Sequence, residues 1–295
     1  MNVSTAISVV IRTRDSARTL ERVIAGLCRS ADDEVIVVDS GSKDATLAIA
    51  RKHGAQVVVA PGPFNYSRSL NLGFTATKNP WVLVISSHAI PVVPRFLEIY
   101  RAAIKAFPGD VSVGYAPSTL SGESGVGTSA EETRYYAADD FQPIEPLCGN
   151  GNAIYRRAVW EKLPFDETIR TAEDKLWLME VIKQGRRIAY IPAARTSNRN
   201  QASLRYMYRK GYSDARARCV KGSGQRIAAH RPMRLYDLAG ALKKIAVKKL
   251  KGEIDLGNWV RHSAHAFGQF FGSRGAQNNS PEWKPGAVGS QKTPP

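Results

Sequence analysis

Short apolar runs alternate with amphipathic segments through the first third of the chain. Four runs of mostly aliphatic residues predict buried strands, because each is short and bounded by polar or turn-forming residues. These strands cover residues 7–11, 34–38, 56–60 and 81–86. Apolar positions with helical spacing predict the helices between them, over residues 17–28, 44–53 and 67–77. This alternation predicts an α/β fold with a parallel sheet and right-handed crossovers.

The pattern changes after the fourth strand. Residues 117–146 are rich in Gly, Ser, Glu and Asp, which is typical of a loop. A Gly/Asn turn then leads into a strand, followed by a short helix, a second helix and another strand. The last three cover residues 157–163, 175–185 and 187–191. Three further helices are predicted over residues 204–220, 235–251 and 256–271, before a Gly/Pro/Asn/Ser-rich tail that we expect to be disordered.

Charge separates the chain into two parts. Residues 1–194 hold 22 basic and 21 acidic residues, whereas residues 195–295 hold 20 basic and 5 acidic ones. The basic part favours an anionic partner: a phospholipid surface, a nucleic acid and an acidic polymer are the alternatives. Three widely spaced cysteines indicate a reducing compartment. The polar start lacks a signal-peptide pattern, and no apolar run reaches the ~18 residues of a membrane span, so we expect a cytoplasmic location.

Polar residues cluster where the predicted strands end, which is where open α/β sheets bind ligands. Asp39 follows the second strand, and Ser86, Ser87 and His88 end the fourth. Arg68 and Asn71 lie one helical turn apart and therefore face the same way. The first strand lacks a following Gly-x-Gly-x-x-Gly sequence, which disfavours a nicotinamide-dinucleotide enzyme.

Four short sequences in this order carry a family resemblance: Ser8–Thr13, Val37–Asp44, Ser67–Gly73 and Ala172–Asp174. Over about residues 6–210 the chain resembles the inverting family 2 glycosyltransferases with the GT-A fold. The segment Phe64–Arg68 resembles the version found in bacterial enzymes that build surface polysaccharides. The resemblance implies a nucleoside-diphosphate sugar as donor and transfer with inversion at the anomeric carbon.

The resemblance also implies roles on the donor side. Asp39 would accept hydrogen bonds from a nucleobase N–H or from ribose hydroxyls; the alternative is an Asx-turn or a helix cap. Thr13 would line the base pocket, with ordinary turn chemistry as the alternative. Arg68 and Asn71 would face the diphosphate, because a guanidinium matches phosphate oxygens in a bidentate way. Asp44 is interpreted as a helix cap.

His88 departs from the family pattern, which has an Asp-x-Asp-like metal-binding element at this point. A neutral imidazole ligates Mn²⁺ but suits Mg²⁺ poorly. Two alternatives stay open: His88 belongs to a weaker Mn²⁺ site, with Asn198 as a weak further candidate, or the site works without metal. In the second alternative Arg68, Arg195 and Arg199 would stabilise the leaving diphosphate.

Asp174 is the candidate catalytic base, because inverting transfer needs a carboxylate that removes the proton of the attacking hydroxyl. Glu173 beside it, and Gly149 with Asn150 upstream, resemble the acceptor side of the family. The alternative is that both acids are there because a helix N-terminus favours them.

We therefore expect a GT-A-like α/β fold with a basic helical C-terminal extension. Its predicted parts are a nucleotide-sugar half, an acceptor half with the catalytic base, a basic amphipathic helical extension and a disordered tail. They cover residues 1–115, 116–200, 201–272 and 273–295. The expected function is hexosyl transfer to a hydroxyl of a surface glycan or lipid-linked acceptor.

Aliphatic residues with helical spacing beside lysines favour peripheral attachment to the inner face of the cytoplasmic membrane. A non-catalytic sugar-nucleotide or polysaccharide-binding subunit with a degenerate metal site is the alternative function. Nucleic acid is not the expected partner, because the basic helices lack a recognised nucleic-acid motif and regularly interleaved aromatics.

Overall fold

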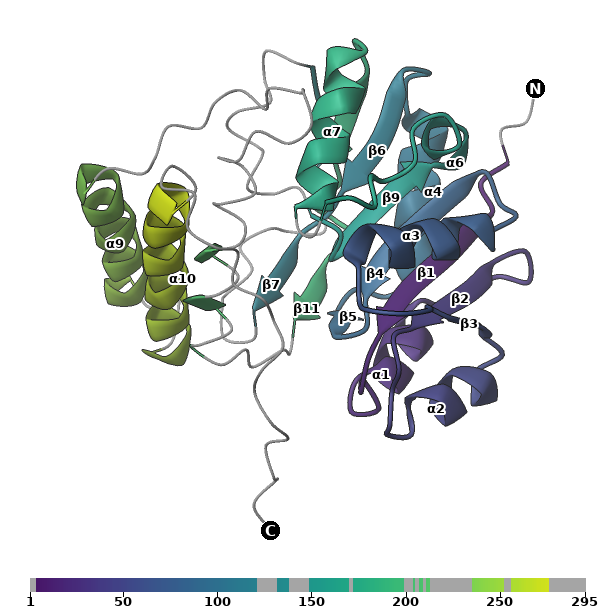
Figure 1. Cartoon of the computed structure of the whole chain (residues 1–295). Coiled ribbons are helices and arrows are strands. Elements are labelled where there is room, and N and C mark those ends of the chain that lie inside the picture. The colour runs from purple at the N-terminus through teal and green to yellow at the C-terminus, as the bar shows by residue number, and fades with distance from the viewer. Residues whose placement is uncertain are drawn as a thin grey trace. The chain divides into compact units, whose positions relative to one another are not determined.

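The chain forms two compact units, one of residues 1–202 with 246–259 and the other of residues 203–245 with 260–295. The computed structural model describes much of the first unit and short parts of the second (Figure 1). The described residues are 4–120, 132–137, 149–169, 172–198, 204, 207–208, 211–212, 235–251 and 256–275.

An eight-stranded mixed sheet forms the centre of the first unit. Its strand order is β3-β2-β1-β4-β9-β6-β10-β8. The strands are β1 (Ile7–Thr13), β2 (Glu34–Asp39), β3 (Gln56–Val59), β4 (Trp81–Ser86), β6 (Val111–Tyr115), β8 (Arg134–Tyr136), β9 (Asn152–Arg156) and β10 (Arg187–Tyr190). Strands β1 to β4 are parallel, whereas β9 runs antiparallel to both of its neighbours and β8 antiparallel to β10. The parallel half brings the ends of β1, β2 and β4 to one edge of the sheet.

A second sheet has three short strands in the order β5-β11-β7. They are β5 (Ala89–Pro91), β7 (Ser118–Leu120) and β11 (Thr196–Asn198). Strand β5 begins immediately after His88, at Ala89, and β11 pairs with it in the antiparallel direction. The turn that contains His88 is therefore anchored at both ends by paired strands.

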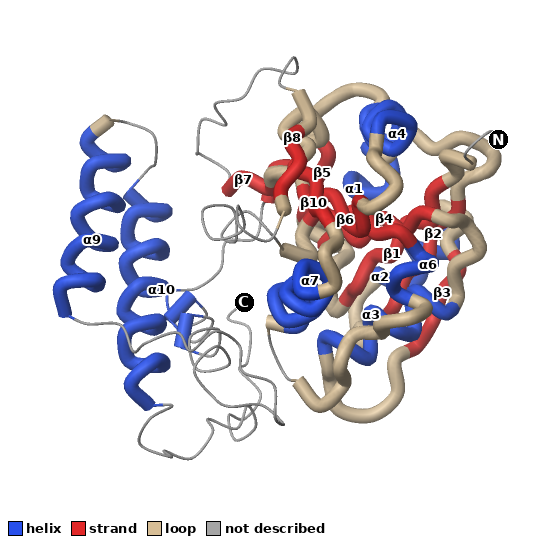
Figure 2. The backbone as a smooth tube through the Cα atoms, turned by 90° about the horizontal axis from the view of Figure 1, so that it is seen from above, coloured by secondary structure: helices blue, strands red, loops and turns tan. Residues whose placement is uncertain are grey.

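Helices cover both faces of the large sheet, and each face has its own apolar core (Figure 2). The helices α1 (Leu20–Gly26), α2 (Thr46–Lys52) and α4 (Phe96–Ala106) contribute to one core. The helices α3 (Tyr66–Thr75), α6 (Arg157–Trp160) and α7 (Glu173–Lys183) contribute to the other. Strands β1 and β4 supply alternate residues to each core, since successive side chains point to opposite faces.

Helix α3 packs closely against the sheet through Gly73. A Cβ atom added there would lie 2.4 Å from Cγ1 of Val10 and 3.1 Å from Cγ2 of Val38. Glycine is required because no side chain fits between helix and sheet. This close approach fixes the beginning of α3, with Arg68, near the carboxyl ends of the strands.

The predicted strands of the first half agree with β1 to β4, and the α/β class is confirmed. Helix α4 and strand β6, over residues 96–106 and 111–115, were not predicted. The segment 117–146 was expected to be loop; its described residues include β7 and β8. The predicted tail begins at residue 273, but residues 273–275 still belong to the last helix, and the rest of the tail lies outside the described residues. Nearly all of the predicted helix over residues 204–220 also lies outside them.

Helices α9 (Leu235–Leu250) and α10 (Leu256–Gly275) agree with the predicted basic extension. In the second unit Leu238, Ala266 and Phe270 form a small buried cluster between them. Among the described residues no helix combines the length and apolar character needed to cross a membrane.

Candidate active site

Residues that end neighbouring strands lie side by side at the carboxyl edge of the parallel half-sheet. Arg12 in β1 pairs in register with Ser86 in β4, and Thr13 pairs with Asp39 in β2. Residues paired across parallel strands have side chains on the same face of the sheet. The edge therefore brings Arg12 beside the segment that leads to His88, and Thr13 beside Asp39.

Asp39 is buried and takes part in a dense set of hydrogen bonds. Its Oδ2 accepts from the backbone N–H groups of Gly41 and Ser42 at 3.0 and 2.9 Å. Its Oδ1 accepts from the hydroxyl of Thr13 at 3.2 Å and from that of Ser42. Four bonds use about the full acceptor capacity of a carboxylate. The predicted pair Asp39 and Thr13 is thus brought together, in the arrangement of the Asx-turn alternative, and the donor contact stays a prediction.

Arg68 and Asn71 face the same way, as their spacing predicted, and both contact Glu167. Nε of Arg68 lies 3.2 Å from Glu167 Oε2, and the amide of Asn71 donates to Glu167 Oε1 at 3.0 Å. Asn71 also donates to the carbonyl of Phe165 and accepts from the Phe165 N–H and the Trp160 indole N–H. These four bonds occupy the whole amide. The geometry gives Asn71 a packing role, and its predicted donor contact remains a prediction.

Arg12 joins three parts of the site. Its Nη1 lies 3.3 Å from Oε1 of Glu173, and the two side chains are only 15% and 7% exposed. Its guanidinium carbon lies 4.9 Å from the ring centre of Tyr66, a cation–π contact. Separating a buried ion pair would leave each charge uncompensated, so the contact with Glu173 restrains the start of α7 against β1. The contact with Tyr66 restrains the start of α3 in the same way.

Asn150 holds the two acids of α7. Its backbone N–H donates to Oδ2 of Asp174 at 3.1 Å, and its side-chain amide donates to Oε1 of Glu173 at 3.2 Å. The side-chain Oδ1 of Asn150 accepts from the hydroxyl of Tyr155. A Cβ atom added to Gly149 would lie 3.5 Å from Oδ2 of Asp174, so the Gly149 backbone borders that carboxylate. The predicted acceptor-side residues are therefore brought together around Asp174.

The two acids differ in environment. Glu173 is buried, and burial raises its pKa; the charge of Asp174 raises the pKa further, while Arg12 opposes the rise. Asp174 is half-buried and lies in the first turn of α7. Ala172 before them has a φ of 62°. This left-handed conformation is unfavourable for any residue with a Cβ atom. The accessible acid of the pair is Asp174, which suits a group that exchanges protons with a substrate.

His88 is half-buried in the turn between β4 and β5. Burial lowers the pKa of its imidazole, and the positive charge of Arg12 lowers it further. Among the described residues no hydrogen-bond partner faces the ring. His88 is therefore a neutral group close to a guanidinium at neutral pH.

The donor atoms at this edge do not fit a divalent cation. Within the described part of the chain, no three His, Cys, Asp or Glu side chains gather to hold a metal ion. The end of β4 offers two serines and His88, and the Ser87 hydroxyl is already 2.8 Å from that of Ser16. Hard cations such as Mg²⁺ need several oxygen ligands. The carboxylate of Asp39 already accepts four hydrogen bonds, and that of Glu173 is paired with Arg12. The side chain of Asn198, and all of Arg199, lie outside the described residues.

Arg12 and Tyr155 belong to the site but were not predicted from the sequence as parts of it. A charged residue near the end of an apolar strand was a usable signal, because a buried arginine needs a partner. Its partner Glu173 is 161 residues away in the chain, and no local pattern identifies it.

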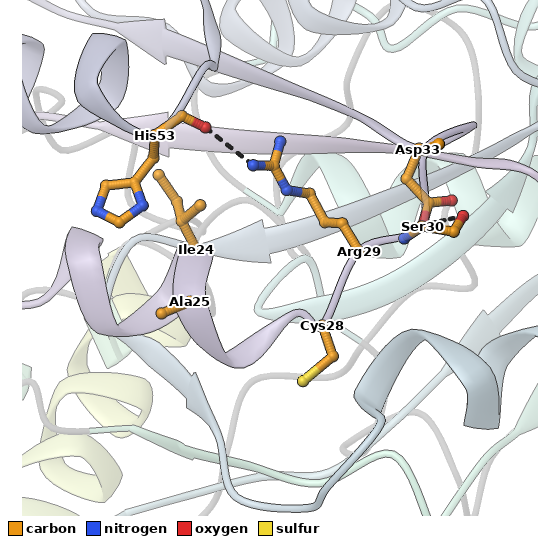
Figure 3. A pocket seen from close by; sticks show the side chains of 8 residues that line it. Ile24, Ala25, Cys28, Arg29, Ser30, Asp33 and His53 are labelled. Carbon is orange, nitrogen blue, oxygen red and sulfur yellow. Dashed lines mark hydrogen bonds between the residues drawn. The ribbon is translucent and has the colours of Figure 1, made fainter.

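A hollow in the surface lies elsewhere, at the end of α1 (Figure 3). Its lining residues are Ile24, Ala25, Cys28, Arg29, Ser30, Ala31, Asp33 and His53. Asp33 directly precedes β2, so the hollow is at the opposite edge of the sheet from the strand ends described above. The side chain of Asp33 is buried there and accepts from Ser30 and Arg101. These contacts indicate a structural network.

Comparison with solved structures places the fold. The chain is similar to the mannosyltransferase PcManGT from Pyrobaculum calidifontis, in complex with GDP-Man and Mn²⁺, with a TM-score of 0.62 and 15% identity over 91% of this chain and 86% of the other. It is also similar to glucosyl-3-phosphoglycerate synthase from Mycobacterium tuberculosis, in complex with Mn²⁺, UDP and glucosyl-3-phosphoglycerate. There the TM-score is 0.54 and the identity 21%, over 74% and 82% of the two chains. These similarities show the GT-A fold.

Sequence comparison identifies the family. An uncharacterized glycosyltransferase from Rickettsia bellii is 42% identical over 81 residues, which are 28% of this chain and 27% of that relative. The chain thus matches about a quarter of the length of this curated relative. The family model described as glycosyl transferase family 2 matches residues 8–163, more than half of the chain. Because this match includes the strand ends that carry Arg12, Thr13, Asp39 and His88, the chain belongs to glycosyltransferase family 2.

Proposed function

We propose that this protein transfers a hexosyl group from a nucleoside-diphosphate sugar to a hydroxyl of a surface glycan, with inversion at the anomeric carbon. The acceptor glycan is either free or linked to a lipid. The observation that carries the proposal is the arrangement at the start of α7. There Asp174 is half-buried, bordered by Gly149 and hydrogen-bonded by the Asn150 N–H at 3.1 Å. The structural neighbours in complex with GDP-Man and with UDP support this class of donor.

The chemistry is a single displacement. The acceptor oxygen forms a bond to the anomeric carbon while the bond from that carbon to the diphosphate oxygen breaks. Asp174 takes the proton of the attacking hydroxyl, and the nucleoside diphosphate leaves with the electron pair of the broken bond. The bond from Asn150 holds one carboxylate oxygen in place, so the proton acceptor is oriented before the acceptor arrives.

The Ser86-Ser87-His88 end of β4 favours a second candidate, a sugar-nucleotide-binding subunit without transferase activity. Donor turnover separates the two candidates. Purified protein is incubated with GDP-mannose, UDP-glucose and further nucleotide sugars, and release of the nucleoside diphosphate is measured with and without candidate acceptors. Acceptor-dependent release supports the transferase, and binding without release supports the subunit.

Asp174→Asn is the decisive variant. We expect turnover to fall by about 10²-fold or more with little change in donor affinity, because a general base acts in the transition state. Glu180→Gln is the matched control: Glu180 lies on the same helix and pairs with Lys183. Near-normal turnover of Asp174→Asn would refute the assignment. Proton NMR of the product tests inversion through the configuration of the new glycosidic bond.

We also propose that the protein binds the cytoplasmic membrane peripherally, at its inner face. On α9 the lysines 243, 244 and 248 are exposed beside Val247 and Leu250, and Leu250 is 87% exposed. Exposed aliphatic side chains flanked by lysines suit an anionic lipid surface, where each basic residue contributes ~1 kcal/mol. A lipid-linked acceptor at that surface would be consistent with this location.

Sedimentation with liposomes tests the attachment. We expect the protein to sediment with phosphatidylserine-containing liposomes at low salt and to be released by high salt. Replacing lysines 243, 244 and 248 with glutamine should reduce the bound fraction. The same replacements at lysines 52, 105 and 162 provide a charge-matched comparison on exposed sites within residues 1–202. The proposal would be refuted if all variants sedimented with the liposomes equally, or if the wild-type protein did not sediment with them.

A further inference from the structure

Among its described residues the site has no metal-binding donor set, but it contains a fixed positive charge beside the end of β4. Arg12 is paired in register with Ser86, the last residue of β4. Its charge also reaches His88, two residues further along. A divalent cation at the end of β4 would therefore lie next to a guanidinium, which repels it. The same guanidinium attracts a diphosphate placed there.

The surroundings of Arg12 hold its guanidinium in place. The carboxylate of Glu173 contacts Nη1, and the ring of Tyr66 lies 4.9 Å from the guanidinium carbon. A guanidinium has five N–H donors, and the contact with Glu173 uses one nitrogen. Further donors of the same planar group match two phosphate oxygens in the bidentate geometry that arginine favours.

Burial makes Arg12 a stronger candidate than the other arginine near the site. Its side chain is 15% exposed, compared with 37% for Arg68, whose Nε is already paired with the half-exposed Glu167. A charge in a less polar environment interacts more strongly with a phosphate than one screened by water. The same environment favours stabilisation of charge that develops on a leaving group.

We propose that Arg12 binds the diphosphate of the sugar donor and supplies the positive charge that a divalent cation supplies in metal-dependent enzymes. The inference rests on the proposed function, since it concerns the same donor. It assigns the charge to a residue of the first strand, held between the starts of α3 and α7. Donor binding is then independent of metal.

Calorimetry of the full chain tests this with UDP, GDP, ADP and dTDP, each in the presence of EDTA and, separately, of Mn²⁺. We expect at least one nucleotide to bind in EDTA with an affinity that Mn²⁺ changes less than threefold. Arg12→Gln alone would leave Glu173 buried without its partner, so the main variant is the double substitution Arg12→Gln/Glu173→Gln. We expect it to weaken metal-free binding about tenfold to a hundredfold, as for loss of hydrogen bonds to a charged group. Arg22→Gln, at an exposed position on α1, is the control and should bind as wild type does.

The outcomes separate this inference from the proposed function. Nucleotide binding that requires Mn²⁺, or that the double variant retains at wild-type affinity while its circular dichroism is native, overturns the role of Arg12 and leaves the transferase proposal standing. The single variant Glu173→Gln keeps Arg12 and shows whether the double variant lost nucleotide affinity through Glu173. If Glu173→Gln alone loses as much affinity as the double variant, the role of Arg12 is also overturned. Failure of every nucleotide under every condition overturns both proposals.

Discussion

Replacing Asn71 with alanine tests whether this residue organises the fold or contacts the donor. Its amide connects α3 to Trp160 at the end of α6 and to the segment that follows, through four hydrogen bonds. The substitution removes all four and leaves the Trp160 indole N–H and the Phe165 backbone N–H without their acceptor. Both donors lie in a partly buried environment, where an unsatisfied group is costly.

The magnitude follows from the three partly buried bonds. Each contributes about 0.5–1.5 kcal/mol, and the exposed bond to Glu167 contributes little, so Asn71→Ala should lower the free energy of unfolding by about 2–4 kcal/mol. Thr75→Ala is the matched control one turn further along α3. Its hydroxyl makes one exposed bond to the Asn71 carbonyl, and its loss should change stability by no more than about 0.5 kcal/mol.

Urea unfolding followed by tryptophan fluorescence measures the effect, and Trp160 reports directly on the altered contact. Donor affinity is measured at a temperature where the variant is still folded. We expect a large loss of stability with donor affinity reduced less than threefold. Wild-type stability combined with a severe loss of donor affinity would refute the structural reasoning and support the donor role predicted from the sequence.

Two further substitutions test other parts of the structure. Gly73→Ala should lower stability by about 1–3 kcal/mol, because its Cβ would lie 2.4 Å from Cγ1 of Val10; thermal unfolding measures this, and Val10→Ala in the same chain should restore part of the loss. The pKa of Glu173 is raised in the folded protein, so its contribution to stability is greatest below its ordinary pKa of 4.5 and is lost as the pH rises through the folded pKa. Glu173→Gln should therefore flatten the dependence of the urea midpoint on pH above 4.5, and an unchanged slope would contradict the raised pKa.

The parallel half of the fold was predictable because β1, β2 and β4 are buried on both faces and read as continuous apolar runs. The edge strand β3 is exposed at both of its ends but keeps three consecutive valines. The helix over residues 96–106 has a clear apolar face, yet it was not predicted from the sequence between Pro91 and Pro117. Strand β6 that follows it contains Gly114, which is unfavourable in a strand on local preference. Its place is set by packing, since a Cβ atom at Gly114 would lie 2.8 Å from Ile191.

Helix boundaries show the same division between local and long-range causes. Asp44 was interpreted as the helix cap, but the N-cap position of α2 is Ala45, which makes no side-chain cap bond. The carboxylate of Asp44, one residue earlier, accepts from the N–H of Thr46, where α2 begins. That contact is local and could be predicted. The contacts of Asn71 with Trp160 and Phe165 join residues about 90 apart, so the sequence spacing correctly predicted which way Asn71 faces but not what it meets.

A continuous chain of polar contacts links the two predicted sides of the site. It runs from Tyr155 through Asn150 and Glu173 to Arg12, while the backbone N–H of Asn150 holds Asp174. Each contact compensates a group that would be costly to bury alone, so the positions of the members depend on one another. A displacement of Arg12 towards a bound diphosphate would weaken its contact with Glu173. Because Asn150 contacts both acids of α7, the donor side and the candidate base are connected through two hydrogen-bonded residues, and substitutions on either side should not be additive.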